Sequence, residues 1–426
     1  MPTKPNIIVF ITHDQGQFLG CYNTRLTPNS LKTPNLDKIA KEGIRFTNYF
    51  CTAPQCSPSR GSIQTSLYPH QNGLMGLTNK GWNLPASNKT LPMYLKDKGY
   101  TTHLIGLQHE TNYPETLGYD TMNKRVGYHK YTTKKLNNQF CEFLISHKKD
   151  KKPFYANFGV IEIHRPFSAF GDPVDVDEVI IPPFLPENEM IRKDFAEFYG
   201  LIHTVDATIG KIMDCLMDTK LYENTLFIFT TDHGAPFPRA KCTLYDPGIK
   251  TVLLMQHPYS SNFSGGDVYE ELLSNIDLLP TLIELTGGTV PKNVEGQSFL
   301  PLLKGETDKI KNSIYTEKSY HDQYDPIRGI RTKNYKLIYN FEPLNTQYLM
   351  PVDIERSYTG QIMKELYNQP REHFELYDLQ KDPLETRNLI QNLEYQDIAI
   401  DLKKQLLTWL KSTNDPILRG KIPPHD

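Results

Sequence analysis

The sequence of 426 residues contains no long apolar run and no excess of charge of either sign. Its net charge is −2, with 23% charged and 38% hydrophobic residues, a balance typical of a globular protein and not of a disordered or membrane chain. We therefore expect no nucleic-acid partner and no membrane partner, and any anion site must be built locally. The oligomeric state stays open.

The amino-terminal segment lacks the features of a targeting sequence. The apolar run at 7–11, IIVFI, has five residues, whereas a bilayer span needs about 20 and a signal core is also longer. The six cysteines have no C-x-x-C spacing and stand at positions 21, 51, 56, 141, 215 and 242. We expect a cytoplasmic protein whose cysteines form neither a disulfide framework nor a zinc knuckle.

Short apolar runs alternate with helix-length segments over most of the chain. The runs expected to be buried strands lie at 7–11, 101–106, 154–161 and 225–230. Segments 33–43 and 197–218 are typical of helices between strands. This alternation predicts an α/β protein with a large, mostly parallel sheet between helices.

The pattern changes near residue 310. Three alternating segments between 313 and 341, joined by short connections, predict a smaller antiparallel sheet. An i, i+4 stripe of Ile and Leu at 398–410 predicts a last helix that packs on it. We expect a catalytic domain at 1–310 and a C-terminal subdomain at 311–426.

Polar side chains follow each of the four expected strands. They are His13 and Asp14, His109, His164, and Asp232 and His233. Any one of them has a structural explanation as a helix cap, but ligands bind beyond the carboxyl ends of parallel strands, so four together favour a site. Oxygen donors alone favour Ca²⁺ or Mg²⁺, and added imidazole shifts the preference toward Mn²⁺ or Zn²⁺.

Residues 56–60 read Cys-Ser-Pro-Ser-Arg. Ser57 is a good N-cap and Pro58 a good first helical residue, so Cys56 is expected at the start of a helix. Backbone N–H groups and the helix dipole favour an oxyanion there, and Arg60, one turn further on, can pair with it. An unmodified thiol at this position would be a nucleophile of low pKa, as in a cysteine hydrolase.

The same five residues spell the C-x-P-S-R signature, and in this the chain resembles the type I sulfatases. In that family a maturation enzyme oxidises the cysteine to formylglycine, whose hydrate is the nucleophile. Other stretches that resemble family motifs are PNIIVFITHDQG, GLQHE, FTTDHGAPFP and ELYDLQKDPLETRNL. The resemblance implies the alkaline-phosphatase-like sulfatase fold. It is strongest to the branch that contains the heparan N-sulfatases, on CSPSRGSIQTSLYPHQNGLMGL, DHGAPFPRAKCTLYDPG and RGIRTKNYKLIYN.

The resemblance also implies roles for individual residues. One divalent metal ion, Ca²⁺ in most of the family with Mn²⁺ as the alternative, would be held by Asp14, Asp232, His233, formylglycine 56 and, as an auxiliary ligand, His13. Residues implied in catalysis are Cys56, Arg60, His109, His164 and Lys241. The implied activity is a sulfohydrolase acting on an N- or O-sulfated amino sugar, as in heparan sulfate degradation. Cys51 lies outside the signature and is expected to pack in the core.

The chain departs from the family pattern at four positions. His13 stands where the family usually has Asp, Leu107 where it has Lys, and in the sulfamidases residue 233 is Asn and residue 241 is Arg. An Asp-His pair resembles the phosphonate monoester hydrolases, so a phosphonate or phosphate ester hydrolase is the main alternative. An inactive carbohydrate-binding relative and an unmodified thiol hydrolase are the others.

Overall fold

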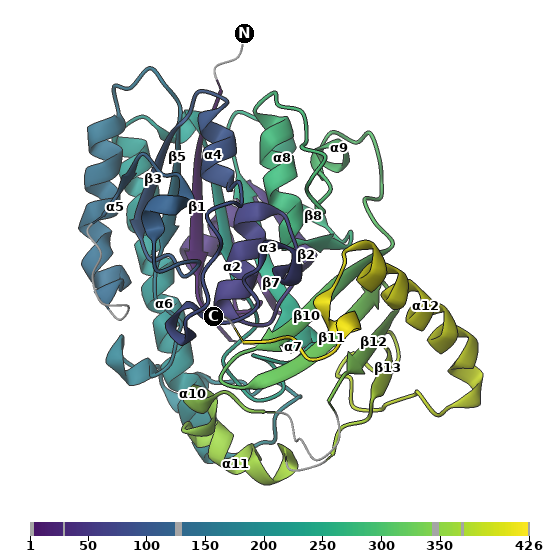
Figure 1. Cartoon of the computed structure of the whole chain (residues 1–426). Coiled ribbons are helices and arrows are strands. Elements are labelled where there is room, and N and C mark those ends of the chain that lie inside the picture. The colour runs from purple at the N-terminus through teal and green to yellow at the C-terminus, as the bar shows by residue number, and fades with distance from the viewer. Residues whose placement is uncertain (1–3, 29, 124–129, 343–348, 368–369, 425–426) are drawn as a thin grey trace.

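The computed structural model describes residues 4–28, 30–123, 130–342, 349–367 and 370–424 (Figure 1). Within them the chain forms two β-sheets surrounded by helices. The strands of the larger sheet are β1 (Asn6–Thr12), β2 (Ile44–Phe50), β3 (Thr101–Gly106), β4 (Thr121–Met122), β5 (Phe154–Gly159), β6 (Thr225–Thr231), β7 (Lys250–Gln256), β8 (Asp267–Tyr269) and β9 (Leu273–Ser274).

The larger sheet is mostly parallel, as the sequence predicts. Its order is β4-β3-β5-β1-β6-β7-β2-β8, with β9 beside β2. β7 runs antiparallel to both of its neighbours, and the pairings around β1, β3 and β5 are parallel. The four strands predicted from the sequence are β1, β3, β5 and β6. The sequence did not predict β2 and β7.

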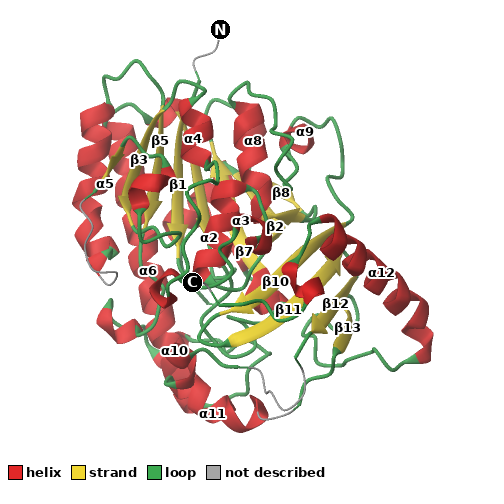
Figure 2. Cartoon of the chain, in the orientation of Figure 1, coloured by secondary structure: helices red, strands yellow, loops and turns green. Residues whose placement is uncertain are grey.

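Helices cover both faces of this sheet (Figure 2). They are α1 (Pro34–Glu42), α2 (Cys56–Thr65), α3 (Pro69–Asn72), α4 (Leu91–Lys96), α5 (Thr133–His147), α6 (Glu189–Asp218), α7 (Asp246–Ile249), α8 (Leu278–Leu285) and α9 (Leu300–Leu303). Because successive strand side chains point to opposite faces, Ile8 and Phe10 of β1 pack with α1, α5 and α6. Ile7 and Val9 pack with α2, α4 and α8.

A second, antiparallel sheet follows in the order β10-β11-β12-β13. Its strands are β10 (Ser313–Tyr320), β11 (Tyr324–Thr332), β12 (Tyr335–Asn340) and β13 (Phe374–Asp378), and the helices of this part are α10 (Val352–Glu355), α11 (Tyr358–Tyr367) and α12 (Gln396–Ser412). Leu402 and Leu406 of α12 share one core with Ile330 and Leu337 of the sheet. The predicted small sheet and last helix are confirmed, and the division at 310/311 stays a prediction.

The expectation that the cysteines stay unpaired is wrong at one place. Cys141 of α5 and Cys215 of α6 form a disulfide with Cα atoms 5.8 Å apart. Their separation of 74 residues carries no spacing signal, and only the packing of α5 on α6 brings them together. Cys51 is buried and free, as expected. The cytoplasmic location rested in part on reduced cysteines and stays a prediction.

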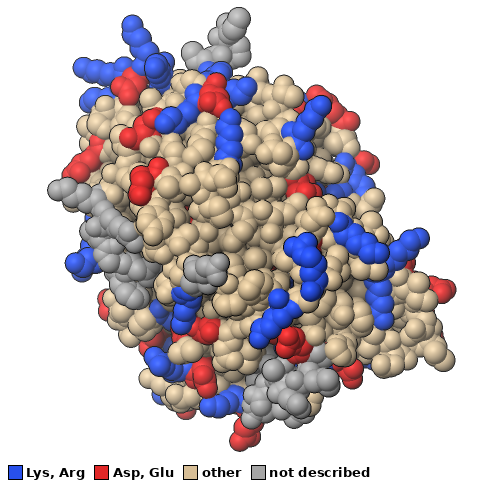
Figure 3. Space-filling model, in the orientation of Figure 1, with Lys and Arg blue, Asp and Glu red and all other residues tan. Residues whose placement is uncertain are grey.

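Two surface properties complete the description. In the part of the chain that the structure describes, no helix combines the length and apolar character needed to cross a membrane. Lys and Arg side chains are interspersed with Asp and Glu over the face drawn in Figure 3.

Candidate active site

The ends of β1 and β6 lie side by side and place two acidic residues together. Thr12 is opposite Thr231 in the register of these strands, so the residues that follow them are neighbours. The backbone N–H of Asp14 donates to Oδ1 of Asp232 over 2.9 Å, and His13 Nδ1 lies 3.1 Å from Oδ2 of Asp232. The side chains of all three are fully buried.

The backbone beyond each strand turns sharply to aim these side chains. Asp14 has a φ of 48°, a left-handed conformation that costs a non-glycine residue about 1 kcal/mol. A Cβ at Gly234 would lie 1.9 Å from the carbonyl oxygen of Pro247, so the close approach after β6 requires glycine. His233 Nδ1 lies 3.0 Å from the carbonyl oxygen of Gly234, and its Nε2 lies 2.9 Å from Oδ1 of Asp14.

Cys56 is the first residue of α2. The helix begins two residues earlier than expected, because Gln55 and not Ser57 is the N-cap: the Ser59 N–H donates to the Gln55 carbonyl oxygen at 3.1 Å. The thiol of Cys56 donates to Oδ1 of Asp14 at 3.5 Å, and its Sγ lies 3.3 Å from Nε2 of His233. The predicted place of Cys56 in the first turn is confirmed.

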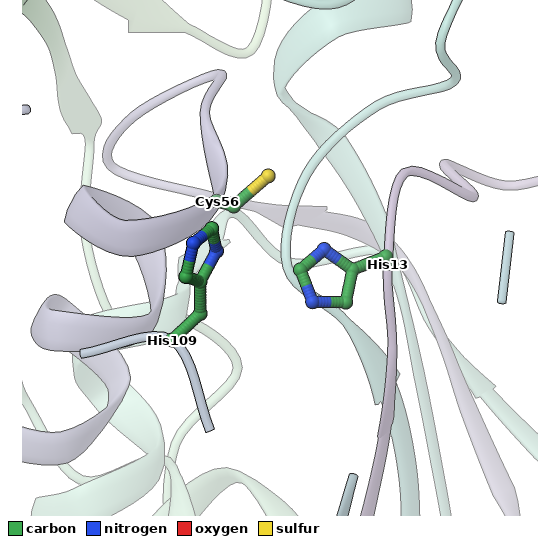
Figure 4. A group of neighbouring side chains, drawn as sticks. All are labelled: His13, Cys56 and His109. Carbon is green, nitrogen blue, oxygen red and sulfur yellow. The ribbon is translucent and has the colours of Figure 1, made fainter. Parts of the chain in front are cut away.

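The group around Cys56 fits a divalent metal ion. Ligand atoms of His13, Asp14, Cys56 and Asp232 all lie within 4.8 Å of one another, and so do those of His13, Cys56 and His109. Figure 4 shows the second group, in which the segment after β1, the start of α2 and the segment after β3 each contribute one side chain. Buried carboxylates and imidazoles on one spot are donors that divalent ions bind. The first group would hold the divalent ion. The ring of His233 lies beside it, with Nε2 2.9 Å from Oδ1 of Asp14.

The thiol of Cys56 is not activated in this environment. Burial raises the pKa of Cys56 well above its ordinary value, the carboxylate of Asp14 raises it further, and Lys241 and Arg60 offset this only in part. The expectation of a low-pKa thiol is therefore wrong. The position at the helix start would lower the pKa, but the buried carboxylates outweigh it.

Two cations lie against the acidic pair. Arg60 reaches back from α2 as expected and donates from Nε to Oδ2 of Asp232 at 3.0 Å. Lys241 Nζ lies 2.7 Å from Oδ2 of Asp14 and 3.0 Å from Oδ2 of Asp353 in α10. Burial favours the neutral amine, but the carboxylates of Asp14 and Asp353 outweigh it and raise the pKa of Lys241 well above its usual value.

Two further imidazoles flank this cluster. The rings of His109 and His164 lie 5.7 Å and 5.9 Å from the ring of His13. Burial lowers the pKa of both, and the charges of Arg60 near His109 and of Lys241 near His164 lower it further. Every site residue expected from the sequence is thus brought to one place.

A cavity of about 960 Å³ opens onto this cluster. Its inner wall contains Cys56, His109, His164 and Lys241, and Leu107 adds an apolar surface. The outer wall contains charged and polar residues that the sequence analysis did not identify: Lys80, His321, Asp322, Asp353 and Arg356. His321 and Asp322 follow β10, so the second sheet contributes residues to the wall of the cavity. No strand end or motif marks Asp353 or Arg356 in the sequence.

Comparison with known families identifies this arrangement. The profile of the family described as Sulfatase matches residues 5–288. The chain belongs to the sulfatase family. It is a hydrolase of that class, and residues 239–371 also match the profile described as N-sulphoglucosamine sulphohydrolase, C-terminal.

Individual relatives agree over nearly the whole chain. An ulvan-active sulfatase of Formosa agariphila is 30% identical over 98% of this chain and 82% of its own length. The human N-sulphoglucosamine sulphohydrolase is 28% identical over 98% of this chain and 94% of its own. A protein solved with D-glucosamine-2-N,6-O-disulfate superposes with a TM-score of 0.73 at 20% identity, covering 97% of this chain and 98% of the other. This last likeness shows the shared fold.

Proposed function

We propose that this sulfatase releases sulfate from a small N- or O-sulfated amino sugar of the N-sulfoglucosamine type. The observation that carries the proposal is Cys56 at a helix start, with ligand atoms of Asp14 and Asp232 within 4.8 Å of its sulfur, on the inner wall of a large cavity. Two likenesses support the substrate class: the N-sulphoglucosamine sulphohydrolase profile over residues 239–371, and the disulfated glucosamine bound by a structural relative.

The nucleophile would be formylglycine, formed from Cys56 by a maturation enzyme, and the match to the sulfatase profile together with Cys56 at the start of α2 supports this. Asp14, Asp232, His233 and residue 56, with His13 as a further ligand, would hold a divalent ion, which would supply the positive charge needed to polarise the sulfate and to ionise the nucleophile. Arg60 keeps the carboxylate of Asp232 oriented through its 3.0 Å bond.

The remaining residues would handle the sulfate and the leaving group. Lys241 and His109, both on the inner wall, would bind sulfate oxygens. His164 or His109 would give a proton to the departing nitrogen or oxygen. Overall, an N-sulfate and one water molecule yield the free amine and sulfate, so the S–N bond breaks and an S–O bond forms.

The test is a panel of N-sulfoglucosamine, 6-O-sulfated N-acetylglucosamine, an aryl sulfate and an aryl phosphonate. We expect the sulfated sugars to be turned over fastest, with sulfate release measured by ion chromatography. Peptide mass spectrometry of active enzyme should find residue 56 as the aldehyde or its hydrate. Full activity with an unmodified thiol would refute the proposed nucleophile.

A phosphonate or phosphate ester hydrolase is the second candidate, and the Asp232-His233 pair favours it. His233 Nε2 lies 2.9 Å from Oδ1 of Asp14 and so lies against the proposed metal site. If the aryl phosphonate is turned over fastest and neither sulfated sugar is hydrolysed, this candidate replaces the sulfohydrolase.

A further inference from the structure

We infer that the metal centre takes a first-row transition ion, Mn²⁺ or Zn²⁺, in preference to Ca²⁺. The inference rests on the metal-dependent function proposed above and names the ion that this chain is built to hold. It follows from two imidazoles, those of His13 and His233, which lie beside the carboxylates of Asp232 and Asp14.

Both imidazoles lie against the acidic pair. His13 Nδ1 lies 3.1 Å from Oδ2 of Asp232 and 3.9 Å from Oδ1 of Asp14. His233 Nε2 lies 2.9 Å from Oδ1 of Asp14 and 3.8 Å from Oδ1 of Asp232. An ion held by these carboxylates would therefore have one ring nitrogen from each strand end within reach. Imidazole nitrogen suits Zn²⁺ and other transition ions, whereas Ca²⁺ takes oxygen ligands.

The hydrogen bonds of His233 prepare it as a ligand. A carbonyl oxygen only accepts, so the 3.0 Å contact of Nδ1 with Gly234 places a proton on Nδ1. Nε2 is then the nitrogen that would bind a metal ion, and it lies 2.9 Å from Oδ1 of Asp14. This arrangement, in which a backbone carbonyl orients a ligating imidazole, is the usual support of a histidine bound to a transition metal.

The carboxylate oxygens of Asp14 and Asp232 already accept hydrogen bonds or ion pairs from neighbouring groups. Oδ2 of Asp14 binds Lys241 at 2.7 Å, and Oδ2 of Asp232 binds Arg60 at 3.0 Å. Oδ1 of Asp232 accepts the backbone N–H groups of Asp14 and His233, each at 2.9 Å. Ca²⁺ needs about six to eight oxygen ligands, so this buried group offers it too few free oxygen atoms. An ion of lower coordination number that accepts nitrogen fits better.

The experiment uses the full chain stripped of metal with a chelator, and isothermal titration with Mn²⁺, Zn²⁺ and Ca²⁺ separately. We expect Mn²⁺ and Zn²⁺ to bind at least tenfold more tightly than Ca²⁺. In the double variant His13→Asp/His233→Asn, which restores oxygen donors, this ratio should fall at least tenfold. Ca²⁺ binding as tightly as Mn²⁺ to the wild type, or an unchanged ratio in a folded double variant, would overturn the inference.

A spectroscopic readout needs no variant. In the Mn²⁺-loaded wild type, electron spin-echo modulation should show ¹⁴N couplings from coordinated imidazole, and their absence would also overturn the inference. Cys56→Ala should keep the preference, since a loss there would mean that sulfur and not imidazole determines it. His257→Asn, which alters a histidine after β7 outside the cavity, is the matched control and should change neither readout.

These measurements separate the inference from the proposed function, because neither requires turnover. An enzyme that binds Mn²⁺ through nitrogen but releases no sulfate with any ion would refute the function and leave the metal assignment standing. Sulfate release by an enzyme that binds Ca²⁺ more tightly than Mn²⁺ or Zn²⁺ would refute the metal assignment and leave the function standing.

Discussion

Lys241 lines the cavity together with Cys56, and the proposed function assigns it a sulfate-binding role. Replacing Lys241 with Ala removes a charge-assisted contact worth about 1.5–3 kcal/mol. We expect kcat/KM to fall about ten- to a hundredfold in steady-state assays on the best substrate of the panel.

Two variants control for a loss of structure at this position. Lys241→Arg keeps the charge but not the shape and should lose less activity. Lys311 also forms a buried ion pair, 2.6 Å from Asp277, but lies outside the cavity. Lys311→Ala should lower stability without changing kcat/KM. Equal losses of kcat/KM in the two alanine variants would mean that Lys241 acts through stability alone.

The proposed catalytic role of Cys56 and its contribution to stability can be measured separately. Cys56→Ala removes the group proposed to be oxidised but only one heavy atom from the core, so we expect no turnover and a change in unfolding free energy of about 1 kcal/mol or less. Sulfate release and urea unfolding measure the two effects. Cys51→Ala is the control, since this equally buried thiol should change stability alone. Residual activity of Cys56→Ala near the wild-type level would contradict the proposed nucleophile.

At the scale of elements, Glu162 connects the segment after β5 to the start of α5. Its carboxylate accepts the backbone N–H of Thr133 at 2.9 Å and the Thr133 hydroxyl at 2.8 Å. Burial raises the pKa of Glu162 from 4.5 to about 7. The folded state therefore binds a proton more tightly than the unfolded state, and the free energy of unfolding falls as pH rises from about 4.5 to 7.

Glu162→Gln should remove this dependence. We expect the wild type to lose about 1–3 kcal/mol of unfolding free energy between pH 5 and pH 8 relative to the variant. Urea unfolding at both values measures it. Glu189→Gln, in the exposed first turn of α6, is the control and should follow the wild type. Parallel pH profiles for wild type and Glu162→Gln would contradict the assignment.

The elements that the sequence predicts well are those with continuous apolar runs. β3 matches its predicted range, β6 is longer than predicted by one residue at its end, and β1 is longer by one residue at each end. β2 was missed because its burial alternates irregularly along a sequence with polar residues. β7 was missed because it runs antiparallel to β6 and follows the four-residue α7, so it lacks the long preceding helix that marks a parallel strand.

The site also contains residues that the sequence predicts and residues that it does not. His13, Asp14, Asp232 and His233 could be predicted because parallel strands in register deliver their following residues to one edge. Asp353 could not, because α10 is joined to the rest of the site by tertiary packing alone. Its contact with Lys241 joins two residues 112 positions apart, a separation that no local pattern encodes.

At the scale of the whole molecule, the Cys141–Cys215 disulfide joins α5 to α6 across a separation of 74 residues. Closing a loop of this length restricts the unfolded chain and stabilises the fold by about 4 kcal/mol in the chain-entropy account. Cys141→Ser/Cys215→Ser should therefore unfold at lower urea and keep kcat/KM, since neither residue lines the cavity. Cys21→Ser, at a partly buried free thiol, is the control. Wild-type stability in the double variant, or free alkylation of both thiols in protein taken from its own host, would show that the bond does not stabilise the native enzyme.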